Sequence, residues 1–396
     1  NNDESSRDNL ILNYVSQEIE NKLRIETSQK AGNWDYMIGV SYEWVKYNNK
    51  TFNRIFTNSG ASDIDYESLI DLHKYGIFAN INRKLLKDKL SLSAGFRADA
   101  NSYSSEMINP LDQFSPRISL SYQISDKLSY NLNAGRYFQL PPYTVLGYRD
   151  NETLINKNNK ITYISANHFV TGFELNFSST GRATIEGYYK QYQNYPFLLR
   201  EQISLANLGG DFGVIGNEPV TSDSRGRTFG LEVLVQQRLY KGFYGIMAYT
   251  YGKSEFTNVN ENYAPSSWDS RHIINLTAGK RFKKNWEAGM RYRYQSGLPT
   301  TPFAFNSDLV LNWNRNFAGI PDYSRINTLR SSASAGLDLR IDKKWFFKKW
   351  ELNLFLDIQN VTANAVGRDV LVLDRPLDEN LKPIGGPEIV NPSAPF

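Results

Sequence analysis

The residues that most often carry chemistry are few and scattered in this chain. Histidine occurs only at His73, His168 and His272, and there is no cysteine among the 396 residues. A zinc site needs several histidine, cysteine or carboxylate ligands brought together. The spacing of these histidines therefore gives no reason to expect a zinc site, and the lack of cysteine excludes disulfides and thiolate ligands.

Two short clusters have the residue types for a site. Asp269, Ser270 and His272 contain the members of a hydrolytic triad, but neighbouring positions on a strand point to opposite faces, so we interpret them as a strand-start motif. Asp63, Asp65 and Glu67 alternate and would direct three carboxylates one way, which makes them a weak calcium candidate. The competing interpretation is a solvated acidic loop. We expect no catalytic residue and no cofactor.

The elements that position these residues follow a strict two-residue period. From Leu90 to Ala98, apolar residues alternate with Ser91, Ser93, Gly95 and Arg97. The same alternation recurs from Trp286 to Gln295 and from Trp350 to Ile358, and about fourteen segments fit it. An all-β fold is predicted.

Composition decides where such strands would lie. Aromatic residues make up 14% of the chain, the charge is nearly balanced at 45 basic and 41 acidic residues, and there is no dense basic run. Nucleic acid is therefore not an expected partner. Mean hydropathy is −0.50, and no apolar stretch reaches the roughly 18 to 20 residues of a membrane helix. A barrel strand needs only about 9 to 11 residues, half of them facing a polar lumen, so these values fit a transmembrane antiparallel β-barrel.

The links between the segments also alternate. Tight links lie near Gly32, Lys87, Ser125, Thr180, Lys241, Lys283 and Phe347. Long polar links are expected at residues 58–66, 101–113, 140–162, 194–225, 255–270, 298–332 and 361–396. Short periplasmic turns and long extracellular loops are typical of outer-membrane barrels. Aromatic residues near strand ends, such as Trp34, Trp44 and Tyr292, fit girdles at the membrane surface, with core packing as the alternative.

Several motifs resemble the barrel of TonB-dependent receptors. They are Phe114-Ser-Pro-Arg117, Gly135-Arg-Tyr137 with Pro141 and Pro142, Trp268-Asp-Ser-Arg-His272, Tyr294-Gln-Ser-Gly297, Pro321-Asp-Tyr323 and Asp357-Ile-Gln-Asn360. Their order covers roughly residues 10 to 365. The resemblance implies the outer membrane of a Gram-negative bacterium, outer-membrane lipid around the barrel, a TonB-type energising protein and, as a further candidate partner, a surface lipoprotein.

The family also joins an N-terminal plug to a barrel of about twenty-two strands. About fourteen segments would be part of such a barrel, so we expect residues 1–396 to be its C-terminal portion, with the plug, about seven first strands and the last strand absent. The prolines between Glu388 and Phe396 do not suit a closing strand, which places Phe396 in a loop.

Two groups of residues are candidates for contact with a ligand or with the plug. Aromatic residues in the expected loops are the ligand-binding candidates, with ordinary loop packing as the alternative: Tyr143, Tyr148, Tyr195, Phe197, Trp313, Phe317 and Tyr323. Charged residues on the polar strand faces are expected to be lumenal, pairing with one another or with the plug: Arg97, Asp99, Arg117, Glu232, Glu287, Arg291, Arg293, Asp338, Arg340, Asp342 and Asp357.

Three functions compete at this point. The first is active import of a large or scarce ligand that is captured at the extracellular loops. The second is passive diffusion through a porin-like channel, which lacks a plug. The third is an outer-membrane enzyme or adhesin, and an enzyme would need a catalytic constellation that the sequence does not show.

Overall fold

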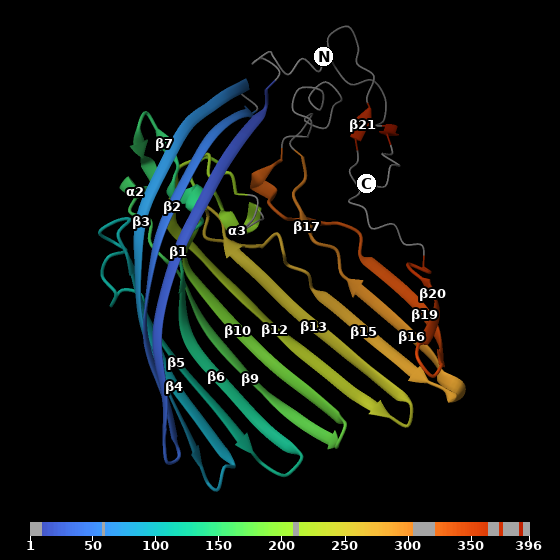
Figure 1. The fold of residues 1–396 in the computed structure, drawn as a ribbon. Coiled ribbons are helices and arrows are strands. Elements are labelled where there is room, and N and C mark those ends of the chain that lie inside the picture. The colour runs from blue at the N-terminus through green and yellow to red at the C-terminus, as the bar shows by residue number, and fades with distance from the viewer. Residues whose placement is uncertain are drawn as a thin grey trace.

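The computed structural model describes residues 10–57, 60–208, 214–303, 321–362, 372–374 and 388–390. These residues form a large curved antiparallel sheet with short helices and strands gathered at one end (Figure 1). No helix within the described ranges is long and apolar enough to cross a membrane.

Fourteen strands follow one another through the sheet in chain order, each antiparallel to the next. Their bounds are β1 Leu12–Ala31, β2 Trp34–Thr57, β3 Gly60–Leu85, β4 Leu90–Asn101, β5 Phe114–Gln123, β6 Leu128–Gln139, β9 Ile164–Ser178, β10 Gly181–Leu198, β12 Val220–Tyr240, β13 Phe243–Thr257, β15 His272–Arg281, β16 Trp286–Gln295, β19 Ser334–Phe346 and β20 Glu351–Ile358. The predicted all-β antiparallel fold is confirmed.

Short elements lie in the connections at one end of the sheet. They are α1 Tyr143–Leu146, β7 Arg149–Asp150, β8 Thr153–Leu154, α2 Ile155–Asn158, β11 Ile203–Ser204, α3 Leu205–Leu208, β14 Tyr263–Pro265, β17 Pro299–Thr300, η3 Tyr323–Arg325 and β18 Leu329–Arg330. The 3₁₀ turn η2 Lys283–Asn285 lies at the other end, and β21 Val372–Asp374 pairs with β22 Glu388–Val390.

The cross-strand register places apolar residues beside apolar residues and polar residues beside polar ones. Met290 on β16 lies opposite Ala278 on β15 and Leu339 on β19, whereas Arg291 lies opposite Thr277 and Asp338. Because side chains alternate along a strand, this pairing gives the sheet one apolar face and one polar face. Each face is therefore continuous over neighbouring strands.

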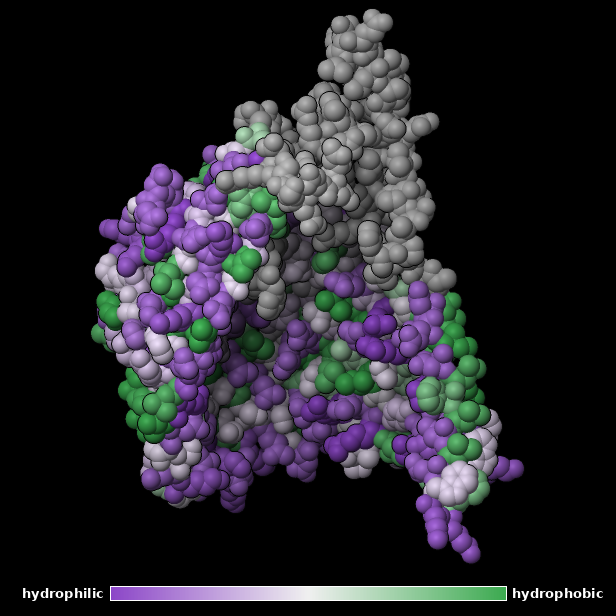
Figure 2. Space-filling view, turned by 45° about the horizontal axis from the view of Figure 1, so that its top comes forward, coloured by the Kyte–Doolittle hydropathy of each residue, from purple (hydrophilic) through white to green (hydrophobic). Residues whose placement is uncertain are grey.

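The polar face is the inner face of the curved sheet. Tyr143, in the connection after β6, contacts both Glu20 on β1 and Lys74 on β3. The connection after β6 therefore folds over the polar faces of β1 and β3, which places these faces on the inside. Figure 2 shows the resulting hollow, with hydrophilic residues lining much of it and hydrophobic residues along the outer flanks.

Tight turns join the strands at one end, at all seven predicted positions. Gly32 and Gly242 lie in two of these turns and have φ angles of +60° and +85°. A side chain is strained in this region of φ, which accounts for glycine there. The other connections are longer, as predicted, with two corrections to their bounds.

The first correction concerns residues 58–66, which are not a long loop. Strands β2 and β3 continue to Thr57 and from Gly60, so most of this segment is strand. The second concerns residues 194–225, because β10 extends to Leu198 and β12 begins at Val220. Polar cross-strand partners such as Arg54 and Asp63 hold the β2–β3 extension together. The β10–β12 extension instead ends in the buried apolar pair of Leu198 and Val220.

The two outermost strands of the sheet do not pair with each other. The path begins at β1 and ends at β20, so the barrel is not closed within the described residues. The predicted open edges at β1 and β20 agree with this arrangement. An exposed strand edge leaves backbone N–H and C=O groups unpaired, which a bilayer does not tolerate.

Candidate ligand-binding site

The connections at the long-loop end pack against each other and form a cap. Its centre is an apolar cluster that includes Leu72 on β3, Leu146 on α1, Ile203 on β11 and Phe256 on β13, all at most 1% exposed. Burial of large apolar side chains contributes most of the free energy that orders such connections. The cap is therefore a fixed structure held on the inner face of the sheet.

Hydrogen bonds join the cap to the first strands. The Tyr143 hydroxyl donates to Glu20 at 2.7 Å and accepts from the Lys74 ammonium at 2.9 Å. Burial and the hydrogen bond to Glu20 raise the pKa of Tyr143. Tyr148 packs its ring edge-on against Tyr66, with the ring centroids 5.5 Å apart. Both predicted ligand aromatics take part in packing the cap.

Tyr195 and Phe197 lie on β10 and not in a loop, which corrects their predicted placement. The Tyr195 ring is buried, with its centroid 4.7 Å from that of Phe256. Phe197 is paired with Ser204 of β11 on one side and with Thr221 of β12 on the other. Trp313 and Phe317 fall outside the described residues.

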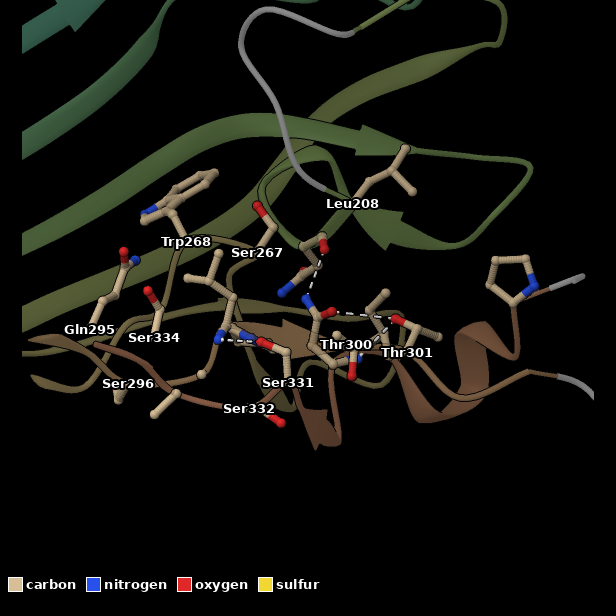
Figure 3. A pocket seen from close by; sticks show the side chains of 18 of the residues that line it. Leu208, Ser267, Trp268, Gln295, Ser296, Thr300, Thr301, Ser331, Ser332 and Ser334 are labelled. Carbon is tan, nitrogen blue, oxygen red and sulfur yellow. Dashed lines mark hydrogen bonds between the residues drawn. The ribbon is translucent and has the colours of Figure 1, made fainter. Parts of the chain in front are cut away.

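Tyr323 is the predicted aromatic that lines a large cavity of the described structure. This cavity has a volume of about 870 Å³ and lies between α3, β17, η3 and the ends of β16 and β19 (Figure 3). Burial raises the pKa of the Tyr323 hydroxyl to about 12. Side chains labelled in Figure 3 include Ser267, Trp268, Gln295, Ser296, Thr300, Thr301, Ser331, Ser332 and Ser334.

Strand register and one buried amide position the cavity wall. Gln295 and Ser334 are direct cross-strand partners at the ends of β16 and β19. Asn327, 6% exposed, donates from its side chain to the Asn207 carbonyl at 2.7 Å and to the Pro265 carbonyl at 2.8 Å. These bonds hold three connections that are far apart in sequence around one space.

Asp269 lies fully buried behind this wall. Its carboxylate accepts from the Ser254 backbone N–H at 2.7 Å, pairs with Arg271 at 2.9 Å and pairs with Arg330. His272 instead contacts Tyr249 through Nδ1 and Ser296 through its backbone N–H. Asp269 therefore anchors arginines, and the arrangement does not form a hydrolytic triad.

The charged residues predicted to be lumenal share the polar face of the sheet. Several pair locally: Arg97 with Asp99, Arg293 with Asp338, and Arg340 with Asp342. Glu287 accepts from Tyr244 at 2.6 Å and from Arg281 at 3.1 Å. Arg117 stacks over the Tyr137 ring, 4.4 Å from its centroid. Cross-strand register places Glu232, Arg291 and Asp357 on the same face.

The acidic segment from Asp63 to Glu67 is part of β3, so the loop interpretation of this segment is wrong. Asp63 pairs with Arg54 at 2.7 Å and Glu67 pairs with Lys50 at 2.7 Å. Within the described ranges no group of three or more His, Cys, Asp or Glu side chains could hold a metal ion. Arg54 and Lys50 account for the carboxylates of Asp63 and Glu67.

A smaller cavity of about 210 Å³ lies next to the large one and shares Tyr323 and Leu208 with it. Glu218 in its wall is 4% exposed, accepts from the Arg200 backbone N–H at 3.1 Å and pairs with the Arg200 guanidinium at 3.2 Å. Burial raises the pKa of Glu218 to about 7, and the positive charge of Arg200 opposes this rise.

Apart from Tyr323, the residues that line the large cavity were not among the predicted site residues, and these include Trp268, Gln295 and Ser334. Trp268 belongs to the motif Trp268-Asp-Ser-Arg-His272, which marked a strand start. Gln295 is the last residue of β16 and Ser334 is the first residue of β19, with 38 residues between them. Their common position depends on pairing of β16 with β19, and alternation alone does not specify that neighbour.

Comparison with known proteins gives a family and a fold. The family model described as "TonB dependent receptor-like, beta-barrel" matches residues 1–361. A search of curated proteins finds no match.

Three solved structures illustrate the likeness in fold. The copper transporter OprC is 14% identical with a TM-score of 0.61, over 97% of this chain and 56% of that one. The ferripyoverdine receptor of the outer membrane of Pseudomonas aeruginosa is 12% identical with a TM-score of 0.59, over 91% of this chain and 46% of that one. The outer-membrane transporter YddB from Escherichia coli is 12% identical with a TM-score of 0.56, over 92% and 52%. The chain spans about half the length of these structures.

Proposed function

This chain belongs to the family of TonB-dependent receptor-like β-barrels and is located in the outer membrane of a Gram-negative bacterium, and from that premise we propose that it is the C-terminal portion of a receptor that actively imports a ligand. The remaining barrel strands and an N-terminal plug would complete the pore. A TonB-type protein would supply the energy. We propose transport and no catalysis.

One observation carries this proposal. The polar inner face ends, on the long-loop side, in a packed cap with a cavity of about 870 Å³. A pocket of this size is in the range that proteins use to enclose small molecules. A fixed pocket at the mouth of a polar hollow suits capture of a ligand before its passage.

The open sheet supports the same proposal over a porin-like channel. A porin of fourteen strands would pair β1 with β20, and these strands are not paired here. Completion by further strands would widen the barrel, since barrel diameter grows with strand number. A barrel of about twenty-two strands is wide enough to hold a plug.

The lumenal charges fit a wall that contacts a plug. Arg97–Asp99, Arg293–Asp338 and Arg340–Asp342 are spread over strands at both ends of the sheet. Charges paired within the wall can exchange partners when a neighbouring polar surface moves past them. We therefore propose that they line the path on which a plug is displaced. A surface lipoprotein remains a candidate partner at the long loops.

The test is uptake in the native bacterium. Cells lacking the receptor gene are grown on limiting nutrients of defined class, namely neutral oligosaccharides, peptides and ferric citrate, to find the nutrient whose use is lost. Restoring the gene should restore its use, and deleting the TonB-type gene should abolish it again. Use of that nutrient that survives loss of the TonB-type protein would mean passive diffusion and would overturn the proposal.

A further inference from the structure

The lining of the large cavity points to one class of ligand. We propose that this cavity binds a neutral oligosaccharide, an inference that rests on the proposed function and names its ligand class. The argument depends on three properties of the lining: free hydrogen-bonding groups, an accessible aromatic ring, and the lack of charge.

The free groups are hydroxyls and an amide. Within the part of the chain that the structure describes, the side chains of Ser267, Gln295, Thr300 and Ser334 form no hydrogen bond with the protein. Figure 3 shows them coming from three separate segments around the cavity. Hydroxyls both donate and accept, and an amide offers two donors and an acceptor. Such a set matches the hydroxyls of a sugar, which also donate and accept.

The aromatic ring is Trp268. It is 44% exposed although it lies in the cavity wall, and it packs edge-on against Phe256 with the ring centroids 5.9 Å apart and the planes at 72°. A tilted contact of this kind does not stack the two rings face to face, and the 44% exposure leaves part of the indole accessible. The negative face of an aromatic ring attracts the weakly positive C–H groups on the apolar side of a sugar ring.

The uncharged lining of the cavity favours a neutral ligand over a charged one. The residues that line the large cavity in the described structure include no Asp, Glu, Lys, Arg or His. Asp269, the neighbour of Trp268 in the chain, is buried and already paired with Arg271 and Arg330. A carboxylate-bearing iron chelate or a charged peptide would lose its hydration there without gaining a charged partner, and such burial is costly. A neutral ligand has no such cost.

The smaller cavity provides the contrast. It contains Arg200, Glu201 and Glu218 and holds about 210 Å³. Charged walls therefore occur elsewhere in the same cap, whereas the larger space is lined by uncharged groups.

The test uses the intact receptor in detergent and calorimetric titration with a fixed panel of probes. The panel contains short neutral oligosaccharides of glucose, mannose, xylose and galactose, with ferric citrate and an uncharged pentapeptide as comparison probes. We expect at least one neutral oligosaccharide to bind. Trp268→Ala should weaken that binding by about tenfold or more, and Gln295→Leu and Ser334→Ala should weaken it as well.

The matched control is Trp286→Ala. Trp286 is 43% exposed, close to the value for Trp268, but lies at the tight-turn end of β16. Its replacement should leave binding unchanged within about twofold. Trp268→Phe keeps an aromatic face and should retain most of the affinity. If Trp268→Ala fails to fold, Gln295→Leu and Ser334→Ala decide the question.

Three results would overturn the inference: no neutral oligosaccharide of the panel binds, the cavity variants leave oligosaccharide binding unchanged, or ferric citrate or the peptide binds and is weakened by Trp268→Ala. Failure of the proposed function gives a different result. If an oligosaccharide binds at the cavity but enters cells without the TonB-type protein, the ligand class stands and active import fails. If the protein drives uptake of ferric citrate alone, import stands and the ligand class fails.

Discussion

The hydroxyl of Tyr143 donates to the carboxylate of Glu20 across 123 residues of sequence, at 2.7 Å. Tyr143 begins α1 in the cap, and Glu20 lies on the first strand of the sheet. The same hydroxyl accepts from Lys74 on β3. This contact fixes the cap to the first strands of the sheet.

Replacing this hydroxyl should therefore loosen the cap. We expect Tyr143→Phe to destabilise residues 140–163 locally by about 1.5 to 3 kcal/mol, the range for a hydrogen bond to a charged group. Hydrogen exchange of that segment in the intact receptor measures the change. Tyr189→Phe is the control, since Tyr189 lies on the apolar face and is 40% exposed. Equal exchange in both variants would show that the contact does not hold the cap.

Loss of the buried Asp269 carboxylate should destabilise the fold more than loss of an exposed carboxylate. Asp269→Asn leaves Arg271 and Arg330 without their shared anion, and we expect a loss of about 3 kcal/mol in the free energy of unfolding. Glu26→Gln, which breaks the exposed pair with Arg24, should cost less than about 1 kcal/mol. Chemical unfolding of both variants compares them. If Asp269→Asn and Glu26→Gln lower the free energy of unfolding equally, the buried ion pairs of Asp269 stabilise the fold no more than an exposed pair does.

The pH dependence of the cap follows from Glu218. Its pKa in the folded protein, about 7, lies above the ordinary value of 4.5. Stability contributed by the protonated carboxyl is therefore complete below about 4.5 and is lost as pH rises through about 7. Over that window we expect the cap to lose up to about 3 kcal/mol.

Hydrogen exchange of the amides from Arg200 to Ser204 tests this, after correction for the intrinsic rate at each pH. Protection should fall between about pH 5 and pH 8 in the native receptor. Glu218→Gln mimics the protonated carboxyl, so its protection should stay constant over that range. A pH response that persists in the Gln variant would assign the effect to another group.

The apolar face should contact lipid. Leu339 lies midway along β19 opposite Met290, whereas Leu354, on the same face, lies opposite Lys343 near a tight turn. Leu339→Arg should therefore cost about 2 to 4 kcal/mol in lipid vesicles, more than Leu354→Arg, because the penalty is largest near the midplane.

The control is Asn133→Arg on the polar face of β6, with an expected cost below about 1 kcal/mol. Spin labels at the even positions from 286 to 294 give a second measure. If lipid-soluble quenchers fail to reach these labels, the assignment of the two faces is reversed.

The membrane part of the fold could be predicted from sequence because lipid on one side and water on the other impose a two-residue period. Turns at Gly32 and Lys241 follow from the same pattern. The strand extensions at residues 58–66 and 194–225 could not, since the first is held by polar cross-strand pairs and the second by burial of Leu198 and Val220 in the cap. Asp63, whose ion pair with Arg54 holds one extension together, fell within the predicted loop because its partner strand is not visible in the sequence.

Less of the candidate site could be predicted from the sequence. Tyr143 and Tyr195 were predicted to bind ligand because they are aromatic residues in polar segments, with loop packing as the alternative. The structure adds their packing partners, such as Phe256 for Tyr195, and a role in ligand binding stays a prediction. The cavity depends on Asn327, Asn207 and Gln295, which come together through three separate connections. Such a tertiary arrangement leaves no local pattern.

The central claim, that these strands are part of a larger barrel, is tested most directly at the two open edges. These 396 residues contain no cysteine. One pair of cysteines at a time can therefore be introduced into them, and the intact receptor is then oxidised in membranes. Cysteines at Ile25 and Val40, which are cross-strand partners on β1 and β2, give the positive control and should form a disulfide. Cysteines scanned along β1 and β20 should form none with each other, because other strands separate these edges. Efficient disulfides between β1 and β20 would instead show a closed fourteen-stranded channel and would contradict the account.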